Sequence, residues 1–211
     1  MAKITKIDLW VEHKDIYSPS AKEPELVKVP PLPYLLVDGE GDPNTAPAFR
    51  EAIGALYSLA YTLKFSMKKQ QGVDFRVMPL SGFFHAEDPT VFTEGRKNEW
   101  KWTLGIPLPA AVTAAEFKKA LAEARAKKNP APALGQVRRE VVREGLCAQI
   151  LHRGPYAAEA PTIRTLHAFI AARGLAFAGS HHEIYVSDPN RSAPEKLKTI
   201  VRQPAKPAKK T

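Results

Sequence analysis

The chain has 211 residues, of which 44% are hydrophobic, and a formal net charge of +9. This length and composition allow a sizeable core, so the sequence indicates one globular unit or a pair of small, similar halves and argues against general disorder. The single cysteine, Cys147, excludes an intrachain disulfide framework and argues against a metal site built from thiolates.

Hydropathy and charge narrow the class of protein further. No run is apolar enough to span a bilayer, and residues 1–7 lack the apolar stretch of a secretion signal, so the sequence favours a cytoplasmic protein without a membrane partner. Basic residues are scattered and no helix-turn-helix or zinc spacing is present, which argues against direct nucleic-acid binding. Residues 205–211 contain three lysines, and we expect them to form a disordered basic tail.

The first half of the chain predicts a strand, a helix and two further strands. An apolar run at 34–37 precedes a turn at 38–43, and Pro47 suits the first turn of a helix, where its missing N–H is not needed. Apolar residues then recur at alternating spacings of four and three, which gives this helix a face for packing on a sheet. Period-two alternation predicts strands at 73–80 and 99–106.

The second half repeats this order. A helix at 114–127 and a Pro-rich linker at 129–133 lead to an apolar run at 148–151, and Pro161 opens the next helix. Two more strands are predicted, at 181–187 and 197–202.

Two similar halves predict a duplicated fold, unless the matching order is a coincidence. We expect one α+β domain over 1–204, made of strand-helix-strand-strand pseudo-repeats at about 27–110 and 134–204. The sheets would be antiparallel with helices on one face. The faces opposite the helices would then line a ligand cleft between the modules.

The strand at 181–187 carries the candidate chemistry. Because side chains alternate across a strand, Glu183 and Tyr185 share one face while His182 takes the other. An edge strand with its polar face in water would explain this pattern, but so would a face that lines a cleft. Burial in a cleft would raise the pKa of Glu183 and let it act as a counterion or a proton donor.

Aromatic residues suggest what such a cleft would bind. Trp100 and Trp102 share a strand face, Phe84 follows a predicted strand, and Tyr61 lies in an aromatic row on the first long helix. An aromatic wall with a carboxylate suits planar or cationic organic molecules, although ordinary core packing would also explain these rings.

The histidines argue against a metal site. His181 and His182 point to opposite faces of a regular strand, so they cannot hold one ion together. His152 precedes a Gly-Pro turn, where it either stabilises the turn or faces the ligand.

Several longer segments of the sequence resemble those of the GyrI-like (gyrase-inhibitor-like) family of small-molecule-binding proteins. The resemblance covers nearly the whole chain except the extreme tail. It rests on residues 34–43, 99–103, 148–156 and 194–204, and above all on His181-His182-Glu183-Ile184-Tyr185-Val186-Ser187-Asp188-Pro189.

This resemblance implies a two-module fold related to the effector-binding domains of multidrug-responsive regulators, with Glu183 facing the ligand. Free-standing relatives include enzymes that hydrolyse cyclopropane-containing, DNA-alkylating natural products, which implies a detoxifying hydrolase without a cofactor. Glu183 would orient or deprotonate the water, and Tyr185 would hydrogen-bond the water or the developing phenolate. Phe83-Phe84 stands where relatives often carry tryptophan, which bears on substrate choice.

Alternative functions remain open from the sequence. The chain could sequester drugs or toxins without turnover, inhibit a topoisomerase by protein interaction, or carry haem. The region before Tyr34 is short and interrupted by prolines, so we expect no winged-helix domain there and prefer an autonomous binder or enzyme.

Overall fold

The structure is a computed structural model that describes residues 4–86, 94 and 96–208. The chain forms two compact units, each assembled from several segments. Unit 1 comprises residues 1–12, 32–80 and 84–142, and unit 2 comprises residues 13–31, 81–83 and 143–211.

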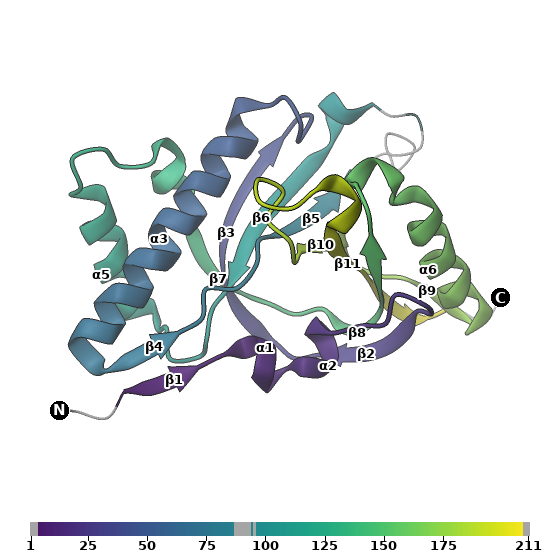
Figure 1. The fold of residues 1–211 in the computed structure, drawn as a ribbon, viewed down its shortest axis with the longest axis horizontal. Coiled ribbons are helices and arrows are strands. Elements are labelled where there is room, and N and C mark those ends of the chain that lie inside the picture. The colour runs from purple at the N-terminus through teal and green to yellow at the C-terminus, as the bar shows by residue number, and fades with distance from the viewer. Residues whose placement is uncertain (1–3, 87–93, 95, 209–211) are drawn as a thin grey trace. The chain divides into compact units, whose positions relative to one another are not determined.

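Unit 1 packs helices on an antiparallel sheet, in which β3 lies between β6 and β7 (Figure 1). A short parallel pair, β1 with β4, forms a separate two-stranded sheet. Its elements are β1 (Thr5–Ile7), α1 (Leu9–Glu12), β3 (Leu32–Glu40), α3 (Pro47–Gln71), β4 (Val73–Phe75), η1 (Lys97–Glu99), β6 (Lys101–Pro107), α5 (Ala114–Arg125), η2 (Pro132–Gln136) and β7 (Arg138–Val142).

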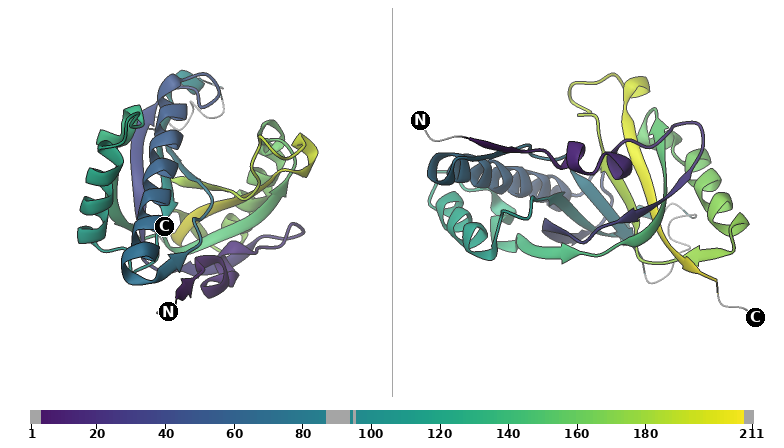
Figure 2. Two further views of the ribbon diagram at one scale, coloured as in Figure 1. Left: turned by 60° about the vertical axis from the view of Figure 1, so that its left-hand side comes forward. Right: turned by 90° about the horizontal axis from the view of Figure 1, so that it is seen from below.

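Helix α3 contributes many of the buried residues of unit 1. It begins at Pro47 as predicted, and Gly72 ends it in the left-handed conformation (φ 66°), where its amide donates to the carbonyls of Met67 and Lys68. Of the predicted apolar stripe, Phe49, Leu56, Ala60, Leu63 and Met67 are buried, and Ile53 is half-buried. Helix α5 runs beside α3 (Figure 2).

Unit 2 is built on antiparallel strands in the order β2, β8, β11, β10, with β9 paired to the far end of β11. Its elements are α2 (Lys14–Tyr17), β2 (Glu25–Val29), β8 (Gly145–Arg153), η3 (Tyr156–Ala158), α6 (Ala160–Ala172), β9 (Leu175–Phe177), β10 (His181–Tyr185), η4 (Pro194–Lys196) and β11 (Lys198–Pro207). Strand β5 (Ser81–His85) begins in unit 2 and ends in unit 1.

Helix α6 covers one face of this sheet. Leu166 and Ile170 of the helix pack on Ile150 of β8 and Val201 of β11. Cys147 is buried. The α+β class and the antiparallel sheets are therefore as predicted.

Several predicted elements differ from the structure. Residues 73–80 do not form one strand: β4 ends at Phe75 and β5 starts at Ser81, and the intervening Pro79 has no N–H for a ladder. The strand predicted at 99–106 starts later, because residues 97–99 form a 3-10 turn.

The expectation of a disordered tail was wrong for residues 205–207. Strand β11 continues through Pro207, and these residues pair with β9. Proline removes only its own N–H from a ladder, and the carbonyl of Pro204 still accepts a hydrogen bond from the Ala178 amide.

Each unit also contains a strand that the predicted repeats assigned to the other half of the chain. Strand β2 belongs to unit 2, although residues 27–31 were expected in the first repeat. Strand β7 belongs to unit 1, although residues 134–142 were expected in the second. Among the described residues, no helix is both long enough and apolar enough to cross a membrane.

Candidate functional site

Strand β10 positions the predicted catalytic pair as the alternation indicated. Glu183 lies opposite Val201 of β11, and Tyr185 lies opposite Thr199. The Tyr185 hydroxyl donates a 2.9 Å hydrogen bond to Oε2 of Glu183, so the two side chains share a face.

That face is not the one expected. Directly opposed residues of antiparallel strands point to the same side, so Glu183 lies on the side of Val201, which α6 covers. The sequence had placed the pair on the face opposite the helices. The pattern of one strand fixes which residues share a face, but the helix that packs there is set by tertiary contacts.

A cluster of polar side chains surrounds this pair. The ring of Tyr156, from η3, meets that of Tyr185 edge-on with centroids 5.4 Å apart. Nε2 of His181 contacts Oε1 of Glu183 at 3.4 Å. We call the whole group the Glu183 cluster; its members are Tyr156, Glu159, His181, Glu183, Tyr185 and Thr199.

Glu159 is a second carboxyl that sequence reasoning missed. It immediately precedes α6, and only 4% of its surface is exposed. Its Oε1 atom and the hydroxyl of the fully buried Thr199 have no hydrogen-bond partner of normal geometry among the described residues. Burial, then the negative charge of Glu183, raises the pKa of Glu159 to about 9.

The pKa of Glu183 shifts in the opposite direction. Burial alone would raise the pKa of this carboxyl, but the His181 ring, the Tyr185 hydroxyl and Glu159 outweigh it and lower the pKa. The expectation of a raised pKa was therefore wrong. The sequence analysis treated Glu183 as a solitary acid and did not count the groups that stabilise its charge.

The phenol of Tyr185 stays protonated. Burial, then the neighbouring charge of Glu183, raises the pKa of Tyr185 well above its ordinary value. The side chain of Glu183 is still 14% exposed. The cluster thus offers a reachable carboxylate with a hydrogen-bonded phenol beside it.

His152 lies at the turn, with both ring nitrogens engaged. Nδ1 is 2.9 Å from Oγ1 of Thr162, and Nε2 is 3.4 Å from the carbonyl oxygen of Pro155. The side chain is 5% exposed. These contacts favour the role in turn structure over a role in ligand binding.

Trp102 belongs to the core of unit 1. Its ring is 1% exposed and meets Phe49 edge-on at 5.0 Å, and its Nε1 donates to the carbonyl of Gly41. Gly39 lies so close that an added Cβ would come within 2.1 Å of the ring. The prediction that Trp102 contacts a ligand is thus corrected: core packing accounts for it.

Of the other predicted aromatics of unit 1, Phe84 is buried and only 6% exposed, whereas Trp100 and Tyr61 are more accessible. Trp100 lies just before β6, contacts the ring of Phe84 edge-on at 5.9 Å and has Lys97 over its ring. Tyr61 is 45% exposed and stacks within the row on α3. Their contact with a ligand stays a prediction.

The face of unit 2 opposite the Glu183 cluster holds a buried ion-pair network. Glu144 accepts from Arg202 at 3.1 Å and lies 2.8 Å from Nδ1 of His182, whose ring stacks on Phe83. Arg202 also donates to Gln149. Burial would raise the pKa of Glu144, but His182 and then Arg202 hold it at about 2.

The two neighbouring histidines, His181 and His182, lie on opposite faces of β10, as the alternation predicted. His182 is fully buried beside Glu144, while His181 contacts Glu183 on the other face. Among the described residues, no group of three or more His, Cys, Asp or Glu side chains could hold a metal ion.

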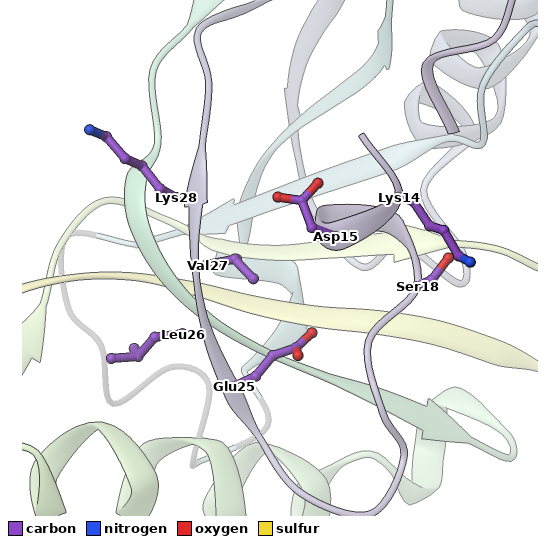
Figure 3. A pocket seen from close by; sticks show the side chains of 7 residues that line it. All are labelled: Lys14, Asp15, Ser18, Glu25, Leu26, Val27 and Lys28. Atoms are coloured by element: carbon purple, nitrogen blue, oxygen red, sulfur yellow. The ribbon is translucent and has the colours of Figure 1, made fainter. Parts of the chain in front are cut away.

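A hollow of about 560 Å³ lies beside β2 and α2 (Figure 3). Figure 3 shows Glu25 and Val27 directed toward α2. Glu25 accepts from Gln149, which faces the Arg202 side of the sheet, so this hollow and the Glu183 cluster lie on opposite faces. The residues that line it are Lys14, Asp15, Ser18, Glu25, Leu26, Val27 and Lys28.

Comparison with known proteins supports one family. The chain resembles an uncharacterized conserved protein from Listeria innocua with 36% identity and a TM-score of 0.87, over 95% of this chain and all of that one. A hydrolase from the same organism is 35% identical with a TM-score of 0.85, over 96% of this chain and all of that one. The C-terminal domain of EcmrR, at 11% identity and a TM-score of 0.56 over 88% of this chain and 98% of that one, shares the fold alone.

No curated protein sequence matches the chain. The model of the GyrI-like small molecule binding domain, however, matches residues 22–205. This match spans both units and agrees with the α+β architecture and with the Listeria structures. The chain is therefore a member of the GyrI-like small-molecule-binding family.

Proposed function

We propose that this protein binds planar, hydrophobic or cationic small molecules at the Glu183 cluster and hydrolyses cyclopropane-containing genotoxins there, which would protect the cell. One observation carries the proposal. Glu183 is a largely buried but reachable carboxylate whose ionised form is stabilised by Tyr185 and His181. A low pKa keeps it available as a base at neutral pH.

The proposed reaction adds water to the strained ring. Water oxygen forms a bond to a ring carbon while a carbon–carbon bond of the cyclopropane breaks, and its electron pair moves into the conjugated carbonyl to give a phenolate. Glu183 accepts one proton of the water, and the phenolate then takes up a proton to give the phenol. The reaction consumes no oxidant, reductant or cofactor.

Tyr185 would orient the water in this scheme. Its O–H donates to Glu183, so its oxygen is free to accept a hydrogen bond from the attacking water. Because the pKa of Tyr185 is raised, the phenol keeps its proton throughout. It positions the base and the water without itself taking a proton.

The Listeria neighbour named a hydrolase supports an enzymatic role, at 35% identity over nearly the whole chain. Trp100, Phe84 and Tyr61 are proposed as aromatic contacts for small molecules. Binding without turnover is the alternative, since an ionised Glu183 would also hold a cation.

The test is water addition. Purified protein is incubated with a panel of cyclopropane-bearing genotoxins, and products are analysed by mass spectrometry. We expect a hydrated product with the wild type and with the exposed control variant Glu195→Gln, and a large loss with Glu183→Gln. A panel without hydrated product would leave binding alone, and equal turnover by Glu183→Gln would refute the proposed base.

A further inference from the structure

The imidazole of His181 lies beside the carboxylate of Glu183. The two residues are two positions apart on β10, so strand alternation places both side chains on one face. Nε2 of His181 is 3.4 Å from Oε1 of Glu183, and Oε2 accepts the 2.9 Å hydrogen bond from Tyr185. Each oxygen of this carboxylate therefore has its own neighbour, an imidazole on one side and a phenol on the other.

The surroundings of Nε2 leave this nitrogen available to Glu183. The atom is buried and makes no hydrogen bond of normal geometry among the described residues. Its 3.4 Å separation from Oε1 is slightly longer than a usual hydrogen bond, and catalytic contacts of this kind often shorten when substrate binds. The side chain of His181 is 19% exposed, so the ring also has access to solvent.

A stronger base beside Glu183 assists the proposed reaction. The contacts that lower the pKa of Glu183 also make it a weaker base, because the driving force for taking a proton from water falls with the pKa. Imidazole binds a proton about a hundredfold more tightly than an ordinary glutamate, since their usual pKa values are about 6.5 and about 4.3. A proton that moves on from the carboxylate to an imidazole is therefore held more favourably.

We infer that His181 is the final acceptor of the proton that Glu183 takes from the attacking water. The pair acts as one base, in which Glu183 faces the water and His181 holds the proton as an imidazolium. This inference rests on the proposed function, namely hydrolysis at Glu183. It adds a residue that acts through Glu183 and needs no contact with the substrate.

The transfer balances without a further reactant. Oε1 of Glu183 takes one proton as an O–H bond of the water breaks, and the proton then passes to Nε2 of His181. An N–H bond forms, and Glu183 is again a carboxylate. Before the reaction the neutral ring holds its proton on Nδ1, which leaves the lone pair of Nε2 facing Oε1. The imidazolium finally releases its proton to solvent, and the phenolate takes up a proton from solvent.

Other ionisable groups face the pair or lie next to it. Burial, then the charge of His181, lowers the pKa of His167 on α6, and burial lowers that of His182 on the opposite face of β10. Burial raises the pKa of Glu159, just before α6, to about 9, and that of Tyr185 further. Because several groups titrate around the pair, a change in the pH profile has to be assigned by substituting His181 itself.

The pH dependence of turnover tests the inference. The assay uses the compound of the cyclopropane panel that the wild type hydrates fastest, with product formation followed by mass spectrometry and the rate without protein subtracted. His181→Gln keeps a polar group beside Oε1 but cannot accept a proton, and His181→Ala leaves space for added imidazole. His13→Gln is the matched control, since His13 directly precedes α2, whose Ile16 carbonyl contacts Arg202 on the other face of the sheet.

The expected results follow from the role of a neutral imidazole. For the wild type and His13→Gln, kcat should fall as the pH drops through the range in which imidazoles take up a proton, between about pH 8 and 5. His181→Gln should lower kcat by about a hundredfold with little change in KM, and its remaining activity should persist to about pH 5, where carboxylates begin to titrate. Added imidazole should restore turnover to His181→Ala but not to Glu183→Gln. A purely structural role of His181 would not shift the pH profile.

The outcomes separate this inference from the proposed function. If His181→Gln keeps the wild-type pH profile or the wild-type kcat, His181 is not the proton acceptor, and Glu183 remains the base. If His181→Gln does not fold, the wild type decides, because a kcat that stays constant down to about pH 5 overturns the inference. If the wild type hydrates no compound of the panel, both ideas are overturned.

Discussion

Replacing Glu144 by Gln should destabilise the protein in a way that depends on pH. Glu144 is the acid of the buried network and is 5% exposed, and its partner Arg202 is 1% exposed. The variant leaves the Arg202 charge buried without its counterion, which typically costs about 3–5 kcal/mol.

The pKa of Glu144 gives a second route to this magnitude. A pKa held near 2 instead of the ordinary 4.5 corresponds to about 3 kcal/mol of folding free energy. Because the folded-state pKa is depressed, this stability is present above about pH 4.5 and is lost as the pH falls toward 2. The two routes agree in order of magnitude.

Urea unfolding of the wild type and Glu144→Gln, from about pH 7 down to about pH 3, measures the difference in free energy of unfolding. We expect the deficit of the variant to shrink by roughly half or more across this range. The exposed variant Glu195→Gln should show no such trend. A deficit of equal size at both ends would show that the charge of Glu144 is not what stabilises the fold.

Three further predictions concern other sites. The stability of Glu159→Gln relative to the wild type should rise by up to about 1.4 kcal/mol per pH unit between about pH 4.5 and 9. The reason is that the raised folded-state pKa of Glu159 makes the wild type lose stability as the pH rises. Urea unfolding at several pH values checks this slope, and a difference that does not change with pH contradicts it. Gly39→Ala should lower the thermal unfolding temperature by several degrees, since its Cβ would collide with the Trp102 ring, and an unchanged temperature would mean that the ring can move away. Tyr61→Ala should change the free energy of unfolding by less than about 0.5 kcal/mol, because the residue is exposed. The same variant should bind the planar 10-methylacridinium cation several-fold more weakly. An unchanged affinity would show that Tyr61 does not contact the ligand.

The sequence predicted those features that depend on neighbouring residues. Pro47 and Pro161 marked helix starts because proline is tolerated only in the first turn, and both helices begin there. The shared face of Glu183 and Tyr185 followed from strand alternation and is confirmed by their hydrogen bond.

The features that the sequence could not predict depend on contacts between residues that are far apart in the chain. Strand β2 finds its partner β8 more than a hundred residues later, and no local pattern encodes that choice. Glu159 was missed for the same reason, because its raised pKa depends in part on the charge of Glu183, which belongs to another element. The sign of the Glu183 pKa shift likewise needed the positions of His181 and Tyr185.

The exchange of strands between the units constrains how the chain can fold and be divided. Strand β3 pairs with β7, and β2 pairs with β8, so each unit needs contacts between residues that are far apart in the sequence. Such contacts carry a high entropic cost of loop closure and slow folding. A cut in the linker at 129–133 would take β7 from unit 1 and β2 from unit 2, so neither fragment could complete its own sheet.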